Sequence, residues 1–161
     1  MSIQTGEKLP AATLYEFVHE ESEGCSIGPQ AVPVQEAAAG KKIALFALPG
    51  AYTPTCSAKH VPGFVALAKE FAAKGVDEIW CVSVNDAFVM GAWGKELGAI
   101  GVVRMLGDGS AEFTKKLGME LDLTTKGLGV RSQRYSMLVN NGVVEKINLD
   151  AGGAFEKSTA E

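Results

Sequence analysis

The sequence predicts an α/β fold in which helices flank a mixed central sheet, and three features of the chain lead to this prediction. Two apolar runs, within 41–48 and 78–84, are typical of strands covered on both faces. The segment between them, 57–74, repeats apolar residues at helical spacing. Later in the chain, two β-prone runs flank Asn140-Asn141-Gly142, which is a strong hairpin signal.

The elements follow from the N-terminus onwards. Residues 1–35 mix short apolar runs with turn residues, so we expect irregular strands and a hairpin there, then one helical turn over 33–39 closed by Gly40. A strand over 41–48 is followed by the helix over 57–74, which Pro62 and Gly63 should bend and Gly75 should end. A strand, a helix and a second strand in this order predict a parallel pair with a right-handed crossover.

The second half begins with a helix capped by Asn85 or Asp86, whose predicted apolar face consists of Phe88, Val89, Ala92, Trp93 and Leu97. A third strand over 102–106, a turn at 107–109 and a short helix over 110–117 follow. An irregular segment containing Gly127 and Gly129 leads into the hairpin strands, 134–139 and 143–149.

These elements form a βαβ unit followed by a hairpin, which is the plan of a thioredoxin-like fold with an N-terminal extension. The chain has 161 residues, of which 47% are hydrophobic, enough to build one substantial core. No internal repeat or linker is evident. We therefore expect a single domain over residues 1–161.

Charge and apolar patterning argue against several partners. The net charge is -4 and the 15 Lys and Arg residues are scattered, so no basic patch is available for nucleic acid. The first ten residues do not resemble a secretion signal, and no apolar run is long enough to span a bilayer. We expect a soluble cytoplasmic protein that binds neither membrane nor nucleic acid.

Three cysteines, Cys25, Cys56 and Cys81, form no CxxC pair, which argues for reduced thiols with a chemical role and against a disulfide scaffold. Cys56 follows a strand end and a Pro-Gly turn and lies in the first turn of the predicted helix. There the unpaired N–H groups and the helix dipole should lower the pKa of its thiol below the free value of about 8.5. The sequence thus predicts a nucleophilic thiolate.

Several neighbours could assist this thiolate. Thr53 could donate a hydrogen bond to the sulfur or to the substrate, or serve only as a turn residue. Arg131 and Arg134 lead into a strand that could run beside the strand before Pro49, and spacing does not choose between them. His60 raises the alternative of a cysteine and histidine dyad, but no third member is recognisable and a packing role is favoured.

The other two cysteines have plainer interpretations. Cys81 lies in the middle of a predicted strand, where a buried, inert thiol is the default. The alternative is a resolving cysteine that attacks oxidised Cys56, which requires their Cα atoms to come within about 7 Å. Cys25 is interpreted as an incidental loop cysteine. One cysteine with one nearby histidine is too few for a zinc site, so no metal is expected.

The residues around Cys56 resemble a known signature. Pro49-Gly-Ala-Tyr-Thr-Pro-Thr-Cys56-Ser, with Lys59-His60-Val-Pro-Gly-Phe64, closely resembles the active-site motif of peroxiredoxins of the type II, or Prx5-like, subgroup. The resemblance continues through 84–93, 107–109 and 127–136 in the same order. Several separated motifs make it specific.

This resemblance implies a thioredoxin-fold peroxidase that reduces hydrogen peroxide and alkyl hydroperoxides without metal, flavin or haem. Cys56 would be the peroxidatic cysteine, which attacks the O–O bond as a thiolate and becomes a sulfenic acid. Thr53 would hydrogen-bond the thiolate and the peroxide, Pro49 would shield the pocket from water, and Arg134 would polarise the peroxide and stabilise the thiolate. Arg131 would support Arg134.

The resemblance also sets expectations for recycling and assembly. The sequence has no cysteine near Glu161, where some relatives carry a resolving residue, and their last helix, beginning near Ser158, should here be short or removed. The sulfenic acid is then most simply reduced by an external thiol, either glutathione with glutaredoxin or thioredoxin. A homodimer that forms through the face near the active site is expected.

Rival functions make different predictions. A non-catalytic thiol redox sensor or interaction module would show oxidation of Cys56 without rapid peroxide turnover. A thioredoxin-type oxidoreductase requires a CxxC pair, which Ser57-Ala58-Lys59 after Cys56 does not supply. A cysteine hydrolase would depend on His60 and consume no peroxide.

Overall fold

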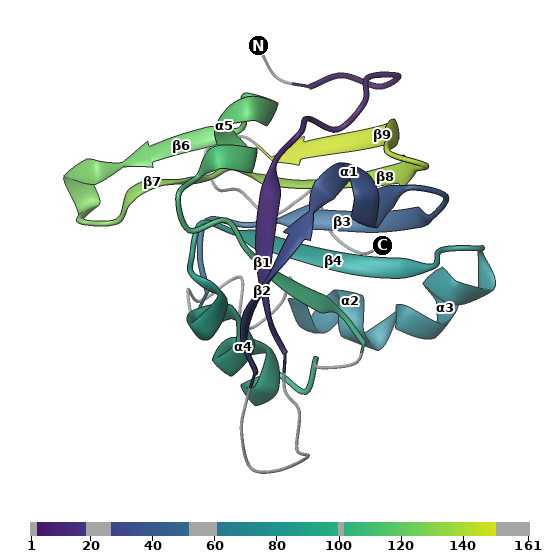
Figure 1. Ribbon diagram of the computed structural model, residues 1–161, viewed down its shortest axis with the longest axis horizontal. Helices are drawn as coiled ribbons and strands as arrows, with labels where there is room; N and C mark the ends of the chain where they lie inside the picture. Colours follow the sequence, from purple (N-terminus) through teal and green to yellow (C-terminus); the bar gives the residue numbers. More distant parts are fainter. Residues whose placement is uncertain (1–2, 19–26, 52–60, 100–101, 151–161) are drawn as a thin grey trace.

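The computed structural model describes residues 3–18, 27–51, 61–99 and 102–150, and these build a mixed sheet flanked by helices, as predicted (Figure 1). The main sheet has seven strands in the order β2-β1-β5-β4-β3-β8-β9. Its strands are β1 (Thr13–Val18), β2 (Ile27–Pro33), β3 (Lys42–Ala47), β4 (Glu78–Ser83), β5 (Arg104–Gly107), β8 (Arg134–Asn140) and β9 (Val143–Asp150). The helices are α1 (Val34–Ala38), α2 (Val61–Ala66), α3 (Ala68–Ala73), α4 (Ala87–Glu96) and α5 (Glu112–Leu117).

The three central strands are parallel, since β4 pairs in parallel with both β3 and β5. The hairpin of β8 and β9 joins antiparallel to β3, and the N-terminal hairpin of β1 and β2 joins antiparallel to β5. Both predicted hairpins are therefore confirmed. Because the central strands are covered on both faces, their apolar residues run continuously along the chain.

Alternate residues of these strands feed two separate cores. Leu45, Trp80 and Tyr135 belong to a cluster that includes apolar residues of α1 and α5. Phe46 and Cys81 belong to a second cluster that includes residues of α2 and α4. Successive side chains of a strand point to opposite faces of the sheet. α1 and α5 therefore cover one face, and α2 and α4 cover the other.

The predicted helix end at Gly75 and the predicted tight turn of the second hairpin are both confirmed. Gly75 has φ +90°, its amide donates to Ala72, and the amide of Val76 donates to Phe71, which together form a Schellman motif. At the hairpin tip, Asn141 and Gly142 have φ values of 51° and 80°. Two consecutive positive φ angles are what a type I′ turn requires.

The helices differ from the prediction in two places. The helix is broken at Leu67, a position that was not predicted, where the Leu67 carbonyl accepts from both Glu70 and Phe71 and tightens the helix. The bend expected at Pro62 and Gly63 stays a prediction, because the residues four positions before them lie outside the described residues. The buried face of α4 consists of Ala87, Met90, Gly91, Trp93 and Gly94, while Phe88 is 60% exposed. The reason is Gly91, whose missing side chain lets α4 pack closely on Phe17 of β1.

Two further predictions need adjustment. The third strand begins at Arg104, two residues later than expected, and extends to Gly107. The segment predicted to be irregular forms a separate two-stranded sheet of β6 (Glu120–Leu123) and β7 (Gly129–Ser132), joined by a short 3₁₀ turn, η3 (Thr124–Lys126). Both strands have only four residues, too few for a clear alternating pattern.

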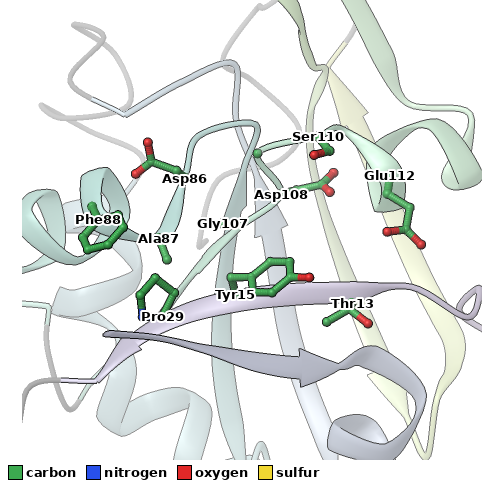
Figure 2. A pocket seen from close by; sticks show the side chains of 11 residues that line it. Thr13, Tyr15, Pro29, Asp86, Ala87, Phe88, Gly107, Asp108, Ser110 and Glu112 are labelled. Atoms are coloured by element: carbon green, nitrogen blue, oxygen red, sulfur yellow. The ribbon is translucent and has the colours of Figure 1, made fainter. Parts of the chain in front are cut away.

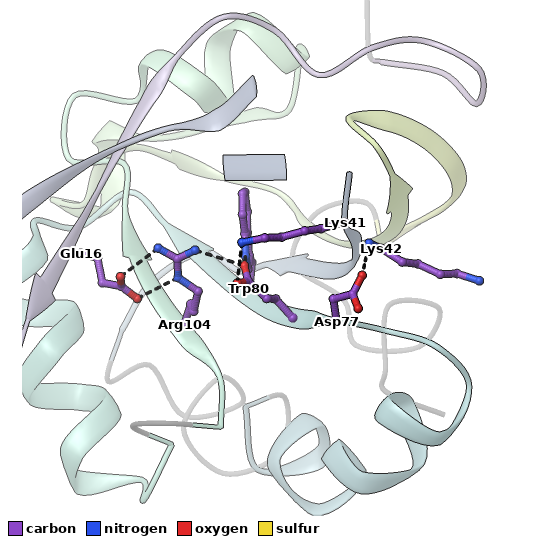
Figure 3. Close-up of polar contacts among 7 residues, drawn as sticks. Glu16, Lys41, Lys42, Asp77, Trp80 and Arg104 are labelled. Atoms are coloured by element: carbon purple, nitrogen blue, oxygen red, sulfur yellow. Dashed lines mark hydrogen bonds and ion pairs between the residues drawn. The ribbon is translucent and has the colours of Figure 1, made fainter. Parts of the chain in front are cut away.

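A charged network attaches the N-terminal hairpin to the central strands (Figure 3). Arg104 of β5 makes a bidentate contact with Glu16 of β1, with N–O distances of 3.0 and 3.1 Å, and also reaches Glu78 of β4 at 3.1 Å. Glu78 further accepts hydrogen bonds from Trp80 and Lys41. Burial acts to raise the pKa of Glu78, but these hydrogen bonds outweigh it and lower the pKa below its usual value.

In the part of the chain that the structure describes, no helix is long and apolar enough to cross a bilayer.

Candidate active site

The turn that precedes Cys56 lies at the carboxyl end of β3, in the middle of the sheet. Its residues follow directly from a fully buried strand end, with Leu48 donating to the carbonyl of Val82 in β4. Gly50 is buried, and Pro49 is half-buried. Pro49 therefore lies just past the carboxyl end of β3, and the predicted nucleophile Cys56 comes seven residues later in the sequence.

Arg134 is the first residue of β8 and lies beside the carboxyl end of β3. β8 runs antiparallel to β3 with Tyr135 opposite Ala47, so Arg134 falls opposite Leu48, next to Pro49 in sequence. Because Tyr135 belongs to the core under α1 and α5, Arg134 points to the other face, that of α2 and α4. Only 3% of Arg134 is exposed. An arginine is rarely buried this fully in a protein, and the pairing of β8 with β3 holds its guanidinium at this position.

Arg131 has a different environment from Arg134. It lies in β7, where its Nε donates to the carbonyl of Leu128 at 2.8 Å and its Nη1 donates to the carbonyl of Val84 at 3.3 Å. The sequence did not distinguish the two arginines. The structure does, because Arg134 is the buried one and Arg131 binds the connection between β4 and α4.

Cys81 lies in β4 beside Phe46 of β3 and has no exposed surface. Its neighbours in the core under α2 and α4 include Phe64, Met90 and Trp93. The default interpretation of a buried thiol is thereby confirmed for its position.

A cavity of about 230 Å³ lies at the end of β5, between the N-terminal hairpin of β1 and β2 and the N-terminus of α4 (Figure 2). Its walls combine the aromatic rings of Tyr15 and Phe88 with the carboxylates of Asp86, Asp108 and Glu112. The turn at Gly107-Asp108-Gly109 was predictable from the sequence, but the cavity was not, because it requires β1 to lie beside β5.

Asp108 is buried in the wall of this cavity, and its carboxylate is occupied by its own chain. It accepts from the amide of Phe113 at 3.2 Å, the amide of Thr114 at 2.8 Å and the hydroxyl of Thr114 at 2.7 Å. Burial raises the pKa of Asp108, and the hydrogen bonds from Thr114 oppose that rise. Asp108 therefore fixes the start of α5 and is not positioned as a ligand.

Several predicted site residues lie outside the described residues, namely Cys25, Thr53, Cys56 and His60. The roles assigned to these four residues from the sequence therefore stay predictions. Among the residues that are described, no cluster of three His, Cys, Asp or Glu side chains could hold a metal ion.

Comparison with known proteins decides the family. The Redoxin family matches residues 4–161 of the chain. The chain is 56% identical to chloroplastic peroxiredoxin-2E of Arabidopsis thaliana over 162 residues, covering 99% of this chain and 67% of that protein. It is 48% identical to peroxiredoxin-2C of the same plant, covering 99% and 94%.

The chain is a type II peroxiredoxin. The structure of reduced Prx3 from Vibrio vulnificus in complex with H2O2 matches it with a TM-score of 0.90 and 51% identity, covering 98% of this chain and 94% of that one. The fold is thus thioredoxin-like, as predicted, and this peroxiredoxin is a thiol peroxidase.

Proposed function

We propose that Cys56 is the peroxidatic cysteine of this peroxiredoxin and that Thr53, Pro49 and Arg134 form the site around it. The observation that carries the proposal is the buried position of Arg134, beside the carboxyl end of β3, which Pro49 follows, and on the face covered by α2. α2 continues the chain from the Cys56 segment. Strand pairing thus brings the Arg134 cation next to the turn at Pro49, seven positions before Cys56 in the sequence, and this supports the proposal.

The chemistry follows from this arrangement. The Cys56 thiolate attacks one oxygen of the peroxide, the O–O bond breaks, and the leaving oxygen takes a proton to give water or an alcohol, while the sulfur becomes a sulfenic acid. Negative charge develops on the leaving oxygen in the transition state. A guanidinium that is shielded from water stabilises such charge more strongly than one in bulk solvent.

Recycling requires two equivalents of thiol. The first thiol attacks the sulfenic acid, releasing water and forming a mixed disulfide, and the second reduces that disulfide and regenerates Cys56. We propose glutathione with glutaredoxin, or thioredoxin, as the source of these thiols. An external thiol is favoured over Cys81 because Cys81 is fully buried in the core.

A peroxide consumption assay tests both points. Reduced protein would be supplied with H2O2 or an alkyl hydroperoxide and with either glutathione and glutaredoxin or a thioredoxin system. We expect turnover for the unmodified chain and for Cys81→Ser, and none for Cys56→Ser. Turnover by Cys56→Ser would refute the site. Loss with folded Cys81→Ser would instead support an internal resolving step.

We further propose that this peroxiredoxin forms a homodimer through the surface around Tyr15 and Phe88. Phe88 is 60% exposed and Tyr15 is 45% exposed, and Phe88 packs its ring against Phe17 at a centroid distance of 5.7 Å. Exposed aromatic residues with a charged rim, here Asp86 and Glu112, are typical of surfaces that a second chain covers.

Sedimentation analysis tests the dimer. Phe88→Ser should shift the wild-type dimer toward monomer at micromolar concentration. Val102→Ser is the matched control, because Val102 is also exposed, at 41%, but lies before the opposite end of β5. A wild-type monomer, or an equal shift in both variants, would contradict the proposal.

A cytoplasmic location is part of the proposal, since a thiol peroxidase needs a reducing compartment to recycle. Imaging of a fluorescent fusion of the full chain in its source cell tests this, and signal confined to another compartment would overturn it.

A further inference from the structure

The turn before Cys56 is held by a side chain from a neighbouring strand connection. Oδ1 of Asn85 accepts a hydrogen bond from the amide of Ala51 at 3.0 Å. Ala51 is the last described residue of the Pro49-Gly50-Ala51 turn, five positions before Cys56. A backbone N–H can only donate, so the atom that faces it is the carboxamide oxygen.

The Asn85 oxygen is itself fixed in place. The hydroxyl of Ser83, which is fully buried, donates to the same oxygen at 2.6 Å. The residue after Asn85 caps α4, with the Asp86 carboxylate accepting from Val89 at 2.8 Å. Asn85 therefore belongs to a rigid connection between β4 and α4, and its side chain has little freedom to leave Ala51.

A residue of β7 also contacts this connection. Arg131 of β7 donates to the carbonyl of Val84, and β7 continues through Gln133 into Arg134. The connection thus contacts the turn that leads to Cys56 through Asn85, and the strand that leads to Arg134 through Val84. Any displacement of it changes the separation between these two parts of the site.

We propose that Asn85 is a positioning residue for the peroxidase reaction, which sets the Cys56 segment at the correct distance from Arg134 through its bond to Ala51. This proposal rests on the assignment of Cys56 and Arg134 above. Attack on the O–O bond needs the sulfur, the peroxide and the guanidinium in alignment, and a displacement of 1 Å can lower a rate about a hundredfold.

Asn85→Ala removes the acceptor, and Asn85→Asp keeps a carboxyl oxygen for both donors. The matched control is Asp77→Ala. Asp77 also accepts from a backbone amide, that of Lys42 at 2.8 Å, but at the opposite end of β3 (Figure 3). Asp77→Ala therefore removes the same kind of hydrogen bond, but far from the site.

Two half-reactions would be measured for each variant over a range of pH, with plateau rates compared so that a changed thiol pKa does not interfere. The first is single-turnover consumption of H2O2 by reduced protein. The second is reduction of the oxidised protein by dithiothreitol. We expect Asn85→Ala to lose about tenfold to a hundredfold in the first step, since alignment matters there. The rate of the second step in Asn85→Ala should stay within about twofold of wild type. Both rates in Asn85→Asp and in Asp77→Ala should do the same.

Several results would overturn the proposal: an Asn85→Ala peroxide rate near that of wild type, an equal loss in Asp77→Ala, an equal loss in both half-reactions, or no recovery in Asn85→Asp. If Asn85→Ala does not fold, Ser83→Ala replaces it, and a wild-type peroxide rate in that variant is then the refuting result. Wild-type protein that consumes no peroxide, or Cys56→Ser that still does, would instead refute the proposed site.

Discussion

Gly107 tests how tightly the connection between β4 and α4 is packed. This glycine is the last residue of β5, which lies between β4 and β1, and it pairs with Ser83 of β4 and Tyr15 of β1. A Cβ atom at this position would lie 2.7 Å from the carbonyl oxygen of Asn85 and 3.0 Å from the amide nitrogen of Ala87. Both are backbone atoms, so no side-chain rotation relieves the contact.

The expected effect of Gly107→Ala follows from these distances. Overpacking of this kind costs about 1–3 kcal/mol, because either β5 or the connection must shift. For a chain of this size, about 2 kcal/mol lowers Tm by about 4–8 °C. The displaced connection should also slow peroxide consumption, since it carries Asn85.

Gly109→Ala is the matched control. The nearest atoms to a Cβ at Gly109 are 3.6 Å away, which is ordinary van der Waals contact. Its Tm should stay near that of wild type. Thermal unfolding followed by circular dichroism measures both variants under identical conditions. If Gly107→Ala were as stable and as active as Gly109→Ala, the connection would be far more tolerant than proposed.

Two further predictions concern stability. Glu78→Gln should lower the free energy of unfolding at neutral pH by about 1–3 kcal/mol, because Glu78 binds Arg104 and Lys41 as a carboxylate. The folded pKa of Glu78 lies below its usual 4.5, so this stability is present above pH 4.5 and should vanish as pH falls through the folded value. Urea unfolding at a series of pH values checks this, and a difference that persists in strong acid would contradict it. Asp86→Ala removes the cap of α4 and should cost about 1 kcal/mol, whereas Asp86→Asn should retain most of it. Equal melting curves for the two Asp86 variants would count against the capping role.

Features decided by neighbours in the chain were predictable from the sequence. The continuous apolar run of 43–48 is typical of a strand covered on both faces, and β3 forms there. Asn141 and Gly142 tolerate the positive φ angles that a tight hairpin needs, and Gly75 ends α3 for the same reason. The motif around Cys56 likewise predicted the peroxiredoxin family, and the similarity to known peroxiredoxins confirmed it.

Other features depend on which segments meet across the fold. Phe88 falls on a plausible apolar face of α4, but the contact of Gly91 with Phe17 selects a different face, and no local pattern reports that contact. Spacing could not separate Arg131 from Arg134. Only the pairing of β8 with β3 buries Arg134 and leaves Arg131 to hold Val84.

The sequence by itself determined the order of strands and helices, their turns and the chemical type of the nucleophile, because these depend on residues close together along the chain. Tertiary structure alone decided that Asn85 reaches Ala51, 34 residues earlier in the chain. It also decided that β1 closes a cavity over the end of β5. Contacts of this kind arise from strand order and register, which are set by the packing of the whole sheet and not by any single segment.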